Sequence, residues 1–275
     1  MINLSKIILS LLFITSLFFV NCSVKKESQF NGKSSGESTY KEKKSDGFNK
    51  DEITIKTSDG IDLSANYFYQ SEKKDISQPV IVLIHQFNQN KEQWSDSFID
   101  SLVNNNYKVF AYDIRGHGKS SKVDYELSNL LTDPKLAPND IIAVFGWLKK
   151  QQGIDTTKIG VLGTSIGGNL ACYSKYFLGA ACVVSVSNSK DGYFTFMGIN
   201  EKAMGGMFVP KISKVLLICG KKDGPHAVDE QYLLDNYIDP PKDIKIYDSD
   251  KHGIFLNREN PEIYTFAINW FKKFL

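Results

Sequence analysis

Short apolar runs recur along the chain from residue 51 onward, and segments with helical periodicity separate them. Runs of this length are typical of strands that are buried on both faces of a parallel sheet. They occupy residues 80–84, 109–112, 159–162, 181–186 and 215–219, and a shorter, more polar run occupies residues 244–247. The pattern therefore predicts a mostly parallel sheet.

Two segments before these runs alternate apolar and polar residues instead. They are residues 52–57 and 61–69, and the turn Ser58-Asp59-Gly60 joins them. Alternation on both sides of such a turn predicts an antiparallel hairpin.

Three segments have an apolar face at helical spacing. Residues 93–104 carry Trp94, Phe98 and Leu102, residues 139–151 carry Ile142, Val144, Phe145 and Leu148, and after Pro261 come Ile263, Phe266, Ala267, Trp270 and Phe274. Strands that alternate with helices predict an α/β fold with helices on both faces of the sheet. We expect a single domain over residues 51–275, because no internal linker or repeat interrupts the pattern.

The N-terminus has the pattern of a targeting segment. Lys6 precedes a 14-residue apolar run, residues 7–20, as in a secretory signal peptide. The run is shorter than the roughly 20 residues that a membrane-spanning helix needs; an uncleaved signal anchor is the alternative. Cys22 and the residues before it resemble the lipobox of bacterial lipoproteins, although Phe19 and Asn21 replace the usual aliphatic and small residues. The resemblance implies that residues 1–21 are removed, that Cys22 is lipidated, and that the protein is anchored to a bacterial membrane on its extracytoplasmic side.

Residues 22–50 are rich in Ser, Lys, Gly and Glu and contain three aromatic residues. Such a segment buries too little apolar surface to offset its ordering entropy, so we expect a flexible tether. Residues 23–50 have a net charge of +3 and Lys6 adds one more positive charge, which leaves about −2 for residues 51–275 out of the total of +2. A near-neutral domain has no electrostatic footprint for nucleic acid.

The most specific chemical signal follows the run at residues 159–162. Gly163-Thr164-Ser165-Ile166-Gly167 is a Gly-x-Ser-x-Gly turn between a strand and a helix, which is the nucleophile elbow. Its glycines are needed because a Cβ would collide with the neighbouring strand and helix. Glycine-rich turns also open ordinary β-α units and phosphate-binding loops, but the lysine of a phosphate loop is missing here.

A nucleophilic serine needs a base and a carboxylate that orients the base. Asp223 follows the run at residues 215–219, and His252 lies beyond the run at residues 244–247. Both loops should open at the same sheet edge as Ser165, where open α/β sheets bind ligands. His226, three residues past Asp223, is expected in the pocket wall. The weaker alternatives are His226 as the base and, as the acid, one of Asp229, Asp248 and Asp250.

Residues 52–275 resemble the α/β-hydrolase fold, near its small esterase and dienelactone-hydrolase-like members. The resemblance rests on the order Ser165, Asp223, His252 and on Asp113-x-Arg115-Gly116-His117-Gly118-x-Ser120. It implies that Ser165, Asp223 and His252 form a catalytic triad, and that His117 stabilises its own loop.

In this family two backbone N–H groups form the oxyanion hole. The resemblance implies that in this chain the two groups are the N–H groups of Ile166 and Phe87. It also implies that His85 braces the loop that contains Phe87. The family usually has Gly where this chain has Gln86. If that position requires φ > 0, Gln costs on the order of 1 kcal/mol; alternatively the loop has another shape, or the amide helps to hold the oxyanion or the substrate.

Residues 188–213 leave room for only a short cap over the site, which implies an open pocket for modest acyl groups. The side chains that would line the pocket, or would equally be ordinary packing, are Phe194, Phe196, Met197, Met204 and Phe208, with His85 and Gln86 at its edge. Cys172, Cys182 and Cys219 occur in apolar contexts, where cysteine is usually a small buried hydrophobe.

No His, Cys or Asp cluster has metal-ligand spacing in the sequence, so we expect no metal and no cofactor. The prediction is a serine hydrolase that cleaves small carboxylic esters through an acyl-enzyme. Thioesters or peptides are alternative substrates for the same triad, and a non-catalytic binding lipoprotein of the same fold is the rival from another class. The sequence does not indicate the oligomeric state.

Overall fold

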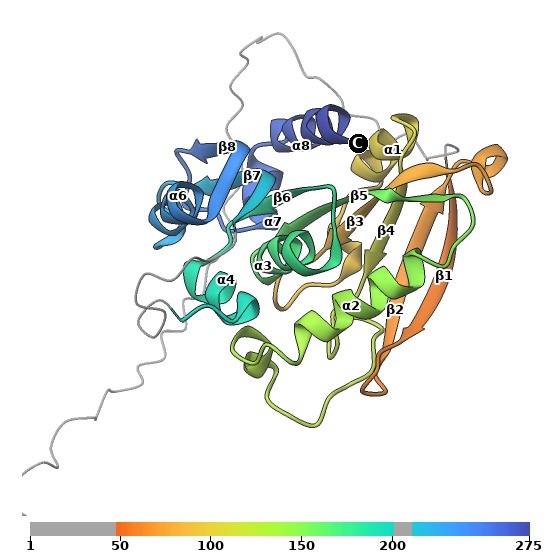
Figure 1. Cartoon of the computed structure of the whole chain (residues 1–275), viewed down its shortest axis with the longest axis horizontal. Coiled ribbons are helices and arrows are strands. Elements are labelled where there is room, and N and C mark those ends of the chain that lie inside the picture. Colours follow the sequence, from red (N-terminus) through yellow and green to blue (C-terminus); the bar gives the residue numbers. More distant parts are fainter. Residues whose placement is uncertain (1–47, 201–210) are drawn as a thin grey trace, which may run out of the picture. The chain divides into compact units, whose positions relative to one another are not determined.

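A mixed sheet organises the part of the chain that this computed structural model describes, residues 48–200 and 211–275 (Figure 1). Its eight strands lie in the order β1-β2-β4-β3-β5-β6-β7-β8. The strands are β1 Asn49–Lys56, β2 Asp62–Tyr69, β3 Gln78–Ile84, β4 Lys108–Tyr112, β5 Ile154–Thr164, β6 Cys182–Val186, β7 Ile212–Gly220 and β8 Ile238–Tyr247. Every strand predicted from the sequence is present.

The N-terminal hairpin is confirmed. β1 pairs antiparallel with β2 from Asn49 opposite Tyr69 to Lys56 opposite Asp62, and β2 pairs antiparallel with β4. All other pairings in the sheet are parallel. β1 begins at Asn49, so the strand starts two residues before the predicted domain boundary at Asp51.

Helices cover both faces of the sheet, as predicted (Figure 1). One buried cluster packs α2, α3, α4 and α6 against one face, and a second cluster packs α1, α7 and α8 against the other. The helices are α1 Asp96–Asn104, α2 Ala137–Leu148, α3 Ile166–Tyr173, α4 Lys190–Met197, α6 His226–Tyr237, α7 Ile254–Glu259 and α8 Glu262–Phe274.

The predicted helices need three corrections, two to their buried faces and one to the start of α1. Ile142 on α2 is 43% exposed, whereas Ile141 beside it is fully buried, and Phe266 on α8 is 38% exposed. Helix α1 begins after Ser95, not at Gln93, because the Ser95 hydroxyl accepts a hydrogen bond from the Phe98 N–H and caps the helix there. The alternating apolar positions alone do not contain this capping information.

The predicted signal peptide, Cys22 and nearly all of the predicted tether lie outside the described residues, as do Met204 and Phe208. Within residues 48–200 and 211–275, no helix combines the length and the apolar character that crossing a membrane requires.

Candidate active site

The C-terminal ends of four parallel strands bring the predicted site residues to one edge of the sheet. In the register of the sheet, Ile84 lies opposite Gly163, Thr164 opposite Val186, and Gly220 opposite Tyr247. The loops that follow β3, β5, β7 and β8 therefore open on the same side. These loops carry His85, Ser165, Asp223 and His252, respectively.

Ser165 has the strained backbone of a nucleophile elbow. Its φ and ψ are 54° and −119°, a conformation that non-glycine residues rarely adopt. The Ser165 N–H donates to the Val186 carbonyl at 2.8 Å, which fixes the turn to strand β6. Ser165 stands between the end of β5 and the start of α3 and is half-buried.

The glycines on both sides of Ser165 are required by close backbone contacts, as the sequence predicted. A Cβ on Gly163 would lie 1.9 Å from the Gly167 carbonyl oxygen, and a Cβ on Gly167 would lie 2.4 Å from the Ile84 carbonyl oxygen. Both distances are far below van der Waals contact. The helix that follows Ser165 can therefore approach β3 only because these residues have no side chain.

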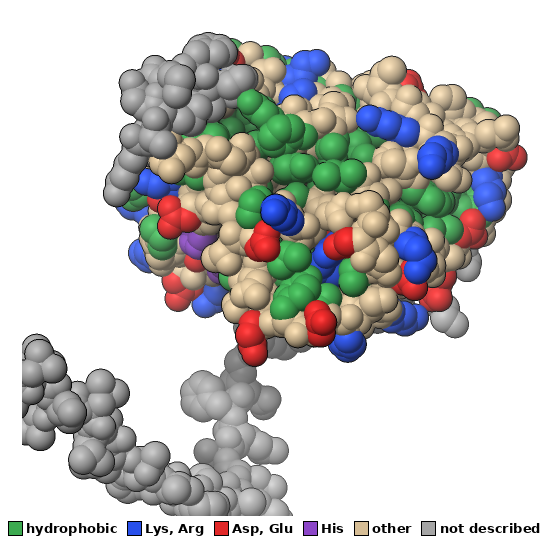
Figure 2. Space-filling model, turned by 60° about the horizontal axis from the view of Figure 1, so that its bottom comes forward, with side chains coloured by type: hydrophobic (Ala, Val, Ile, Leu, Met, Phe, Trp, Pro, Cys, Tyr) green, Lys and Arg blue, Asp and Glu red, His purple; other side chains and the backbone are tan. Residues whose placement is uncertain are grey.

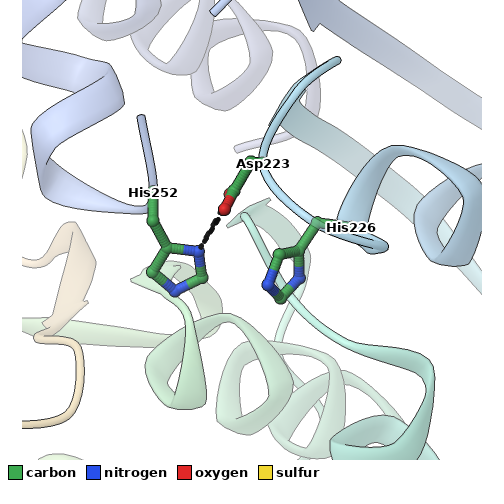
Figure 3. A group of neighbouring side chains, drawn as sticks. All are labelled: Asp223, His226 and His252. Carbon is green, nitrogen blue, oxygen red and sulfur yellow. Dashed lines mark hydrogen bonds and ion pairs between the residues drawn. The ribbon is translucent and has the colours of Figure 1, made fainter. Parts of the chain in front are cut away.

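His252 and Asp223 form a hydrogen-bonded pair (Figure 3). The His252 Nδ1 lies 2.9 Å from Oδ2 and 3.1 Å from Oδ1 of Asp223. The Asp223 side chain is 9% exposed, and that of His252 is 32% exposed. A carboxylate at Nδ1 places the proton of the neutral ring on Nδ1, so that Nε2 keeps its lone pair.

The three rival carboxylates are engaged by other groups. Asp229 accepts from the Lys190 N–H at 3.1 Å, Asp248 pairs with the Lys222 ammonium at 2.7 Å, and Asp250 pairs with the Lys251 ammonium at 2.8 Å. Among these four aspartates, Asp223 is the one that pairs with His252.

The His252 loop lies directly against the elbow. The Gly253 N–H donates to the Ser187 hydroxyl at 3.0 Å, and Ser187 follows Val186, the residue whose carbonyl holds the Ser165 N–H. A Cβ on Gly253 would lie 3.5 Å from Cβ of Thr164. Within the described residues, no hydrogen bond joins the Ser165 hydroxyl to the His252 ring or to another side chain.

His85 fixes the direction of the peptide group that precedes Phe87. Burial lowers the pKa of His85 to about 4, so its ring is neutral near pH 7. Its Nε2 accepts from the Ile114 N–H at 2.9 Å, which leaves the proton on Nδ1 to be donated to the Gln86 carbonyl at 2.8 Å. The N–H of Phe87 points away from that carbonyl, because the two groups are opposed across a trans peptide.

Neither the Phe87 N–H nor the Ile166 N–H donates a hydrogen bond to another described residue. Ile166 is the first residue of α3, where backbone N–H groups have no intrahelical partner, so its N–H can donate to another group. The N–H groups of Phe87 and Ile166 are the two donors that the sequence assigned to the oxyanion hole.

Gln86, the departure from the family pattern, does not require φ > 0; the positive φ in this loop belongs to Asn88, at 60°. The Gln86 side chain is buried, and its Oε1 accepts from the Ile254 N–H at 2.7 Å. The amide oxygen therefore ties the Phe87 loop to the His252 loop. The side chain occupies space that Gly253 leaves open, since a Cβ there would lie 2.1 Å from Oε1.

His117 supports the same loop from the Arg-Gly-His-Gly motif. Its Nε2 accepts from the Asn88 N–H at 3.1 Å, and its Nδ1 donates to the Arg115 carbonyl at 3.1 Å. Its partners thus extend beyond its own loop to the loop of Phe87, which the sequence alone did not indicate.

The described part of the predicted pocket wall is mostly interior packing. Phe196 and Met197 are buried in the core cluster, 3% and 8% exposed. Phe194 is half-buried and packs edge-on against Tyr237, with ring centroids 5.1 Å apart. Cys172, Cys182 and Cys219 are free thiols and buried, as expected.

Two residues of α6 belong to the surroundings of the site: His226, which the sequence indicated as a residue of the pocket wall, and Glu230, which was not assigned to the site from the sequence. His226 lies beside His252, with ring centroids 4.6 Å apart, and its Nδ1 donates to the Asn188 carbonyl at 2.8 Å. Glu230 is fully buried and accepts from the Asn188 N–H at 3.0 Å; burial raises its pKa well above the ordinary value. No sequence motif marks either contact, because Asn188 and α6 are about 40 positions apart.

Histidine reaches the surface on the face shown in Figure 2, next to acidic side chains. His226 and His252 are the half-buried histidines of the chain, whereas His85 and His117 are buried.

Comparison with known proteins agrees with the fold. The model of the family described as alpha/beta hydrolase fold matches residues 79–174. An esterase from Pyrococcus furiosus, Pf2001, superposes with a TM-score of 0.64 over 82% of this chain and 93% of its own, at 21% identity. The chain has the α/β-hydrolase fold. An acetyl xylan esterase from Paenibacillus sp. R4 superposes with a TM-score of 0.65 over 86% of this α/β-hydrolase-fold chain and 87% of its own, at 16% identity.

Curated relatives match a shorter part of the chain. An Escherichia coli protein, described as an uncharacterized 31.7 kDa protein in the traX-finO intergenic region, is 29% identical over 166 residues. The match covers 58% of this chain and 53% of the relative. The chain thus matches about half the length of this relative.

Proposed function

We propose that the protein is a serine hydrolase that cleaves carboxylic esters, with Ser165 as nucleophile, His252 as general base and Asp223 as the residue that orients the base. The observation that carries the proposal is the Asp223–His252 hydrogen bond of 2.9 Å at the sheet edge where Ser165 occupies a strained elbow. The presence of two esterases among the proteins of similar fold supports an ester as the substrate.

In the proposed reaction, the Nε2 lone pair of His252 accepts the Ser165 hydroxyl proton as the oxygen attacks the acyl carbon. Asp223 holds the ring in the tautomer that keeps this lone pair and stabilises the imidazolium that forms. The imidazolium then protonates the leaving alcohol, and an acyl-enzyme on Ser165 remains. Water activated by His252 releases the acid and restores the serine.

The negative charge of the tetrahedral intermediate would be held by the N–H groups of Ile166 and Phe87. These donors need no reorganisation, because Ile166 begins helix α3 and the peptide group before Phe87 is fixed by His85.

Hydrolysis of p-nitrophenyl acetate, butyrate and octanoate tests this proposal. We expect the wild type to prefer the short chains, Ser165→Ala and His252→Ala to lose kcat by several orders of magnitude, and Asp248→Asn, a neighbouring carboxylate outside the triad, to remain close to wild type. Full activity in folded Ser165→Ala would contradict the assignment of the nucleophile.

We also propose that Cys22 is lipidated and that a bacterial membrane holds the protein on its extracytoplasmic side. The support is the sequence of residues 1–22 alone: a short apolar run after Lys6 that ends at Asn21-Cys22.

A further inference from the structure

Asp223 and His252 share their surroundings with a second histidine that the proposed mechanism does not use. Asp223, His226 and His252 each offer one ligand atom, and the three atoms lie within 4.8 Å of one another. Figure 3 shows the two rings side by side, with the Asp223 carboxylate above the gap between them. The sequence did not reveal this group, since His226 and His252 are 26 positions apart.

The tautomer of His226 is set for binding a cation. Its Nδ1–H donates to the Asn188 carbonyl at 2.8 Å, so Nε2 carries the lone pair. Glu230 fixes Asn188 in turn, because its carboxyl group accepts a hydrogen bond from the Asn188 backbone N–H. A histidine whose other nitrogen donates to a backbone carbonyl is the usual arrangement of a metal-binding imidazole.

The donor set selects the metal. Two imidazole nitrogens and one carboxylate oxygen, with a fourth position open to solvent, suit Zn²⁺. With bonds of about 2.0–2.2 Å in tetrahedral geometry, neighbouring ligand atoms lie roughly 3.4 Å apart. The Asp223–His252 pair, at 2.9 Å, would open slightly, and the wider distances within the 4.8 Å group would close by side-chain rotation.

We propose that Asp223, His226 and His252 form an inhibitory Zn²⁺ site. The inference rests on the proposed function, because the inhibited step is the transfer of the Ser165 proton to His252. Zn²⁺ binds the Asp223 carboxylate, Nε2 of His226 and Nδ1 of His252, and the ring proton of His252 moves from Nδ1 to Nε2. No proton is gained or lost overall, and nothing is oxidised.

The consequence for catalysis follows from this change of tautomer. With its Nδ1 on the metal and its proton on Nε2, the His252 ring has no lone pair to accept the Ser165 proton. Zinc therefore stops the enzyme without touching the serine. Removing the metal with a chelator restores the original tautomer and the activity.

Zinc binding and zinc inhibition are measured separately on the full chain without an affinity tag. Calorimetric titration with ZnCl₂ uses Ser165→Ala, which cannot turn over ester, and the inhibition assay uses the wild type with p-nitrophenyl acetate. We expect one high-affinity zinc per chain, inhibition at the same zinc concentration, and full recovery with EDTA.

His226→Asn is the decisive variant, because its amide can still donate to the Asn188 carbonyl while Nε2 is lost. We expect zinc affinity, and inhibition relative to the variant's own rate, to weaken by more than about tenfold. Asp235→Asn, which removes an exposed carboxylate from the same helix, should bind zinc as the wild type does. If His226→Asn does not fold, by circular dichroism, His226→Gln takes its place.

Zinc binding that is unchanged in the folded His226 variant would place the metal elsewhere and overturn the site. Saturable zinc binding that depends on His226 in a protein with no esterase activity would instead keep the metal site and contradict the proposed function. Binding that depends on His226 without inhibition of an active enzyme would overturn the inhibitory role.

Discussion

Two residues of the site, Ser165 and Gly253, have almost the same unusual backbone, with φ and ψ of 54° and −119° in one and 55° and −122° in the other. In Ser165 this strain turns the hydroxyl out of the elbow. In Gly253 it lets the chain pass Gln86, whose Oε1 holds the Ile254 N–H. The two positions belong to different loops of the site: the Ser165 N–H donates to a backbone carbonyl, and the Gly253 N–H donates to the Ser187 hydroxyl.

Gly253→Ala should therefore destabilise the fold more than an alanine at another glycine with positive φ. The backbone conformation alone costs on the order of 1–3 kcal/mol, and displacing Gln86 would add roughly 1 kcal/mol for the lost hydrogen bond. Gly179→Ala is the matched control, since Gly179 has φ of +82° but nothing within 4 Å of its added Cβ. Urea unfolding of both variants measures the difference.

A double-mutant cycle separates the two contributions. Gln86→Ala should cost less stability in Gly253→Ala than in the wild type, because the hydrogen bond is already lost there. Strictly additive free energies of unfolding would show that Gln86 and Gly253 do not interact in this way.

The pairing of Asp59 with Arg115 should make the stability of the fold depend on pH. The Arg115 guanidinium, which donates two hydrogen bonds to Asp59, lowers the pKa of this carboxyl from 3.8 to about 2. A carboxyl group whose pKa is lower in the folded state than in the unfolded state stabilises the fold at pH values above its unfolded-state pKa. This stabilisation is lost as the pH falls through the folded-state pKa. The wild type should therefore be more stable than Asp59→Asn at pH 7.

The advantage of the wild type should shrink between about pH 4 and pH 2, measured as the free energy of urea unfolding at each pH. Asp124→Asn, at the surface, controls for the loss of one negative charge. A wild-type advantage that stays constant down to pH 2 would contradict this account of the Asp59–Arg115 pair.

At the scale of elements, the loop that contains Phe87, for which we propose the oxyanion role, is held by two buried histidines that follow different strands. His85 follows β3 and links the loop to Ile114, and His117 follows β4 and accepts from the Asn88 N–H. Gln86 ties the loop to the segment after His252. The loop therefore keeps the Phe87 N–H in one direction without help from a substrate.

His85 is accordingly a positioning residue, and its replacement should lower kcat while leaving KM for p-nitrophenyl acetate nearly unchanged. In His85→Leu both hydrogen bonds are lost, and removing an oxyanion donor costs on the order of 10²-fold in kcat. His85→Asn can keep a donor near the Gln86 carbonyl and should lose less. Equal kcat in folded His85→Leu and wild type would show that His85 does not position the donor.

The elements themselves were predictable to different degrees. The strands could be predicted because buried parallel strands are continuous apolar runs. The order of Ser165, Asp223 and His252 along the chain, which resembles that of α/β-hydrolases, predicted that Asp223 pairs with His252. The start of α1, the exposed sides of Ile142 and Phe266, and the contacts of His226 and Glu230 were not found. The start of α1 has a local signal in the capping residue Ser95, which apolar periodicity does not include. The others depend on the direction of a helix relative to the sheet and on contacts between distant loops, which leave no local pattern.

At the scale of the whole molecule, the sheet order and the two helical layers confirm the predicted fold class. The fold explains why the loops meet at one edge, but it does not select the bond that is cleaved. The segment before residue 48 adds a proposal about location that is independent of the catalytic one.

The proposed anchor makes a prediction of its own. When the full gene is expressed in a bacterial host with a clickable palmitate analogue, the wild type should be labelled and recovered with membranes, whereas Cys22→Ser should be unlabelled and should lose the anchor that two acyl chains provide. Both should hydrolyse p-nitrophenyl acetate at the same rate per folded molecule. Equal labelling of Cys22→Ser would contradict lipidation at this residue.

Labelling with a fluorophosphonate probe is the first experiment to carry out, because the probe reacts with serines that a base has made nucleophilic. We expect the wild type to be labelled on the peptide that contains Ser165, as identified by mass spectrometry, and Ser165→Ala and His252→Ala to remain unlabelled. A folded wild type that remains unlabelled, or that is labelled at another residue, would contradict the proposed role of Ser165.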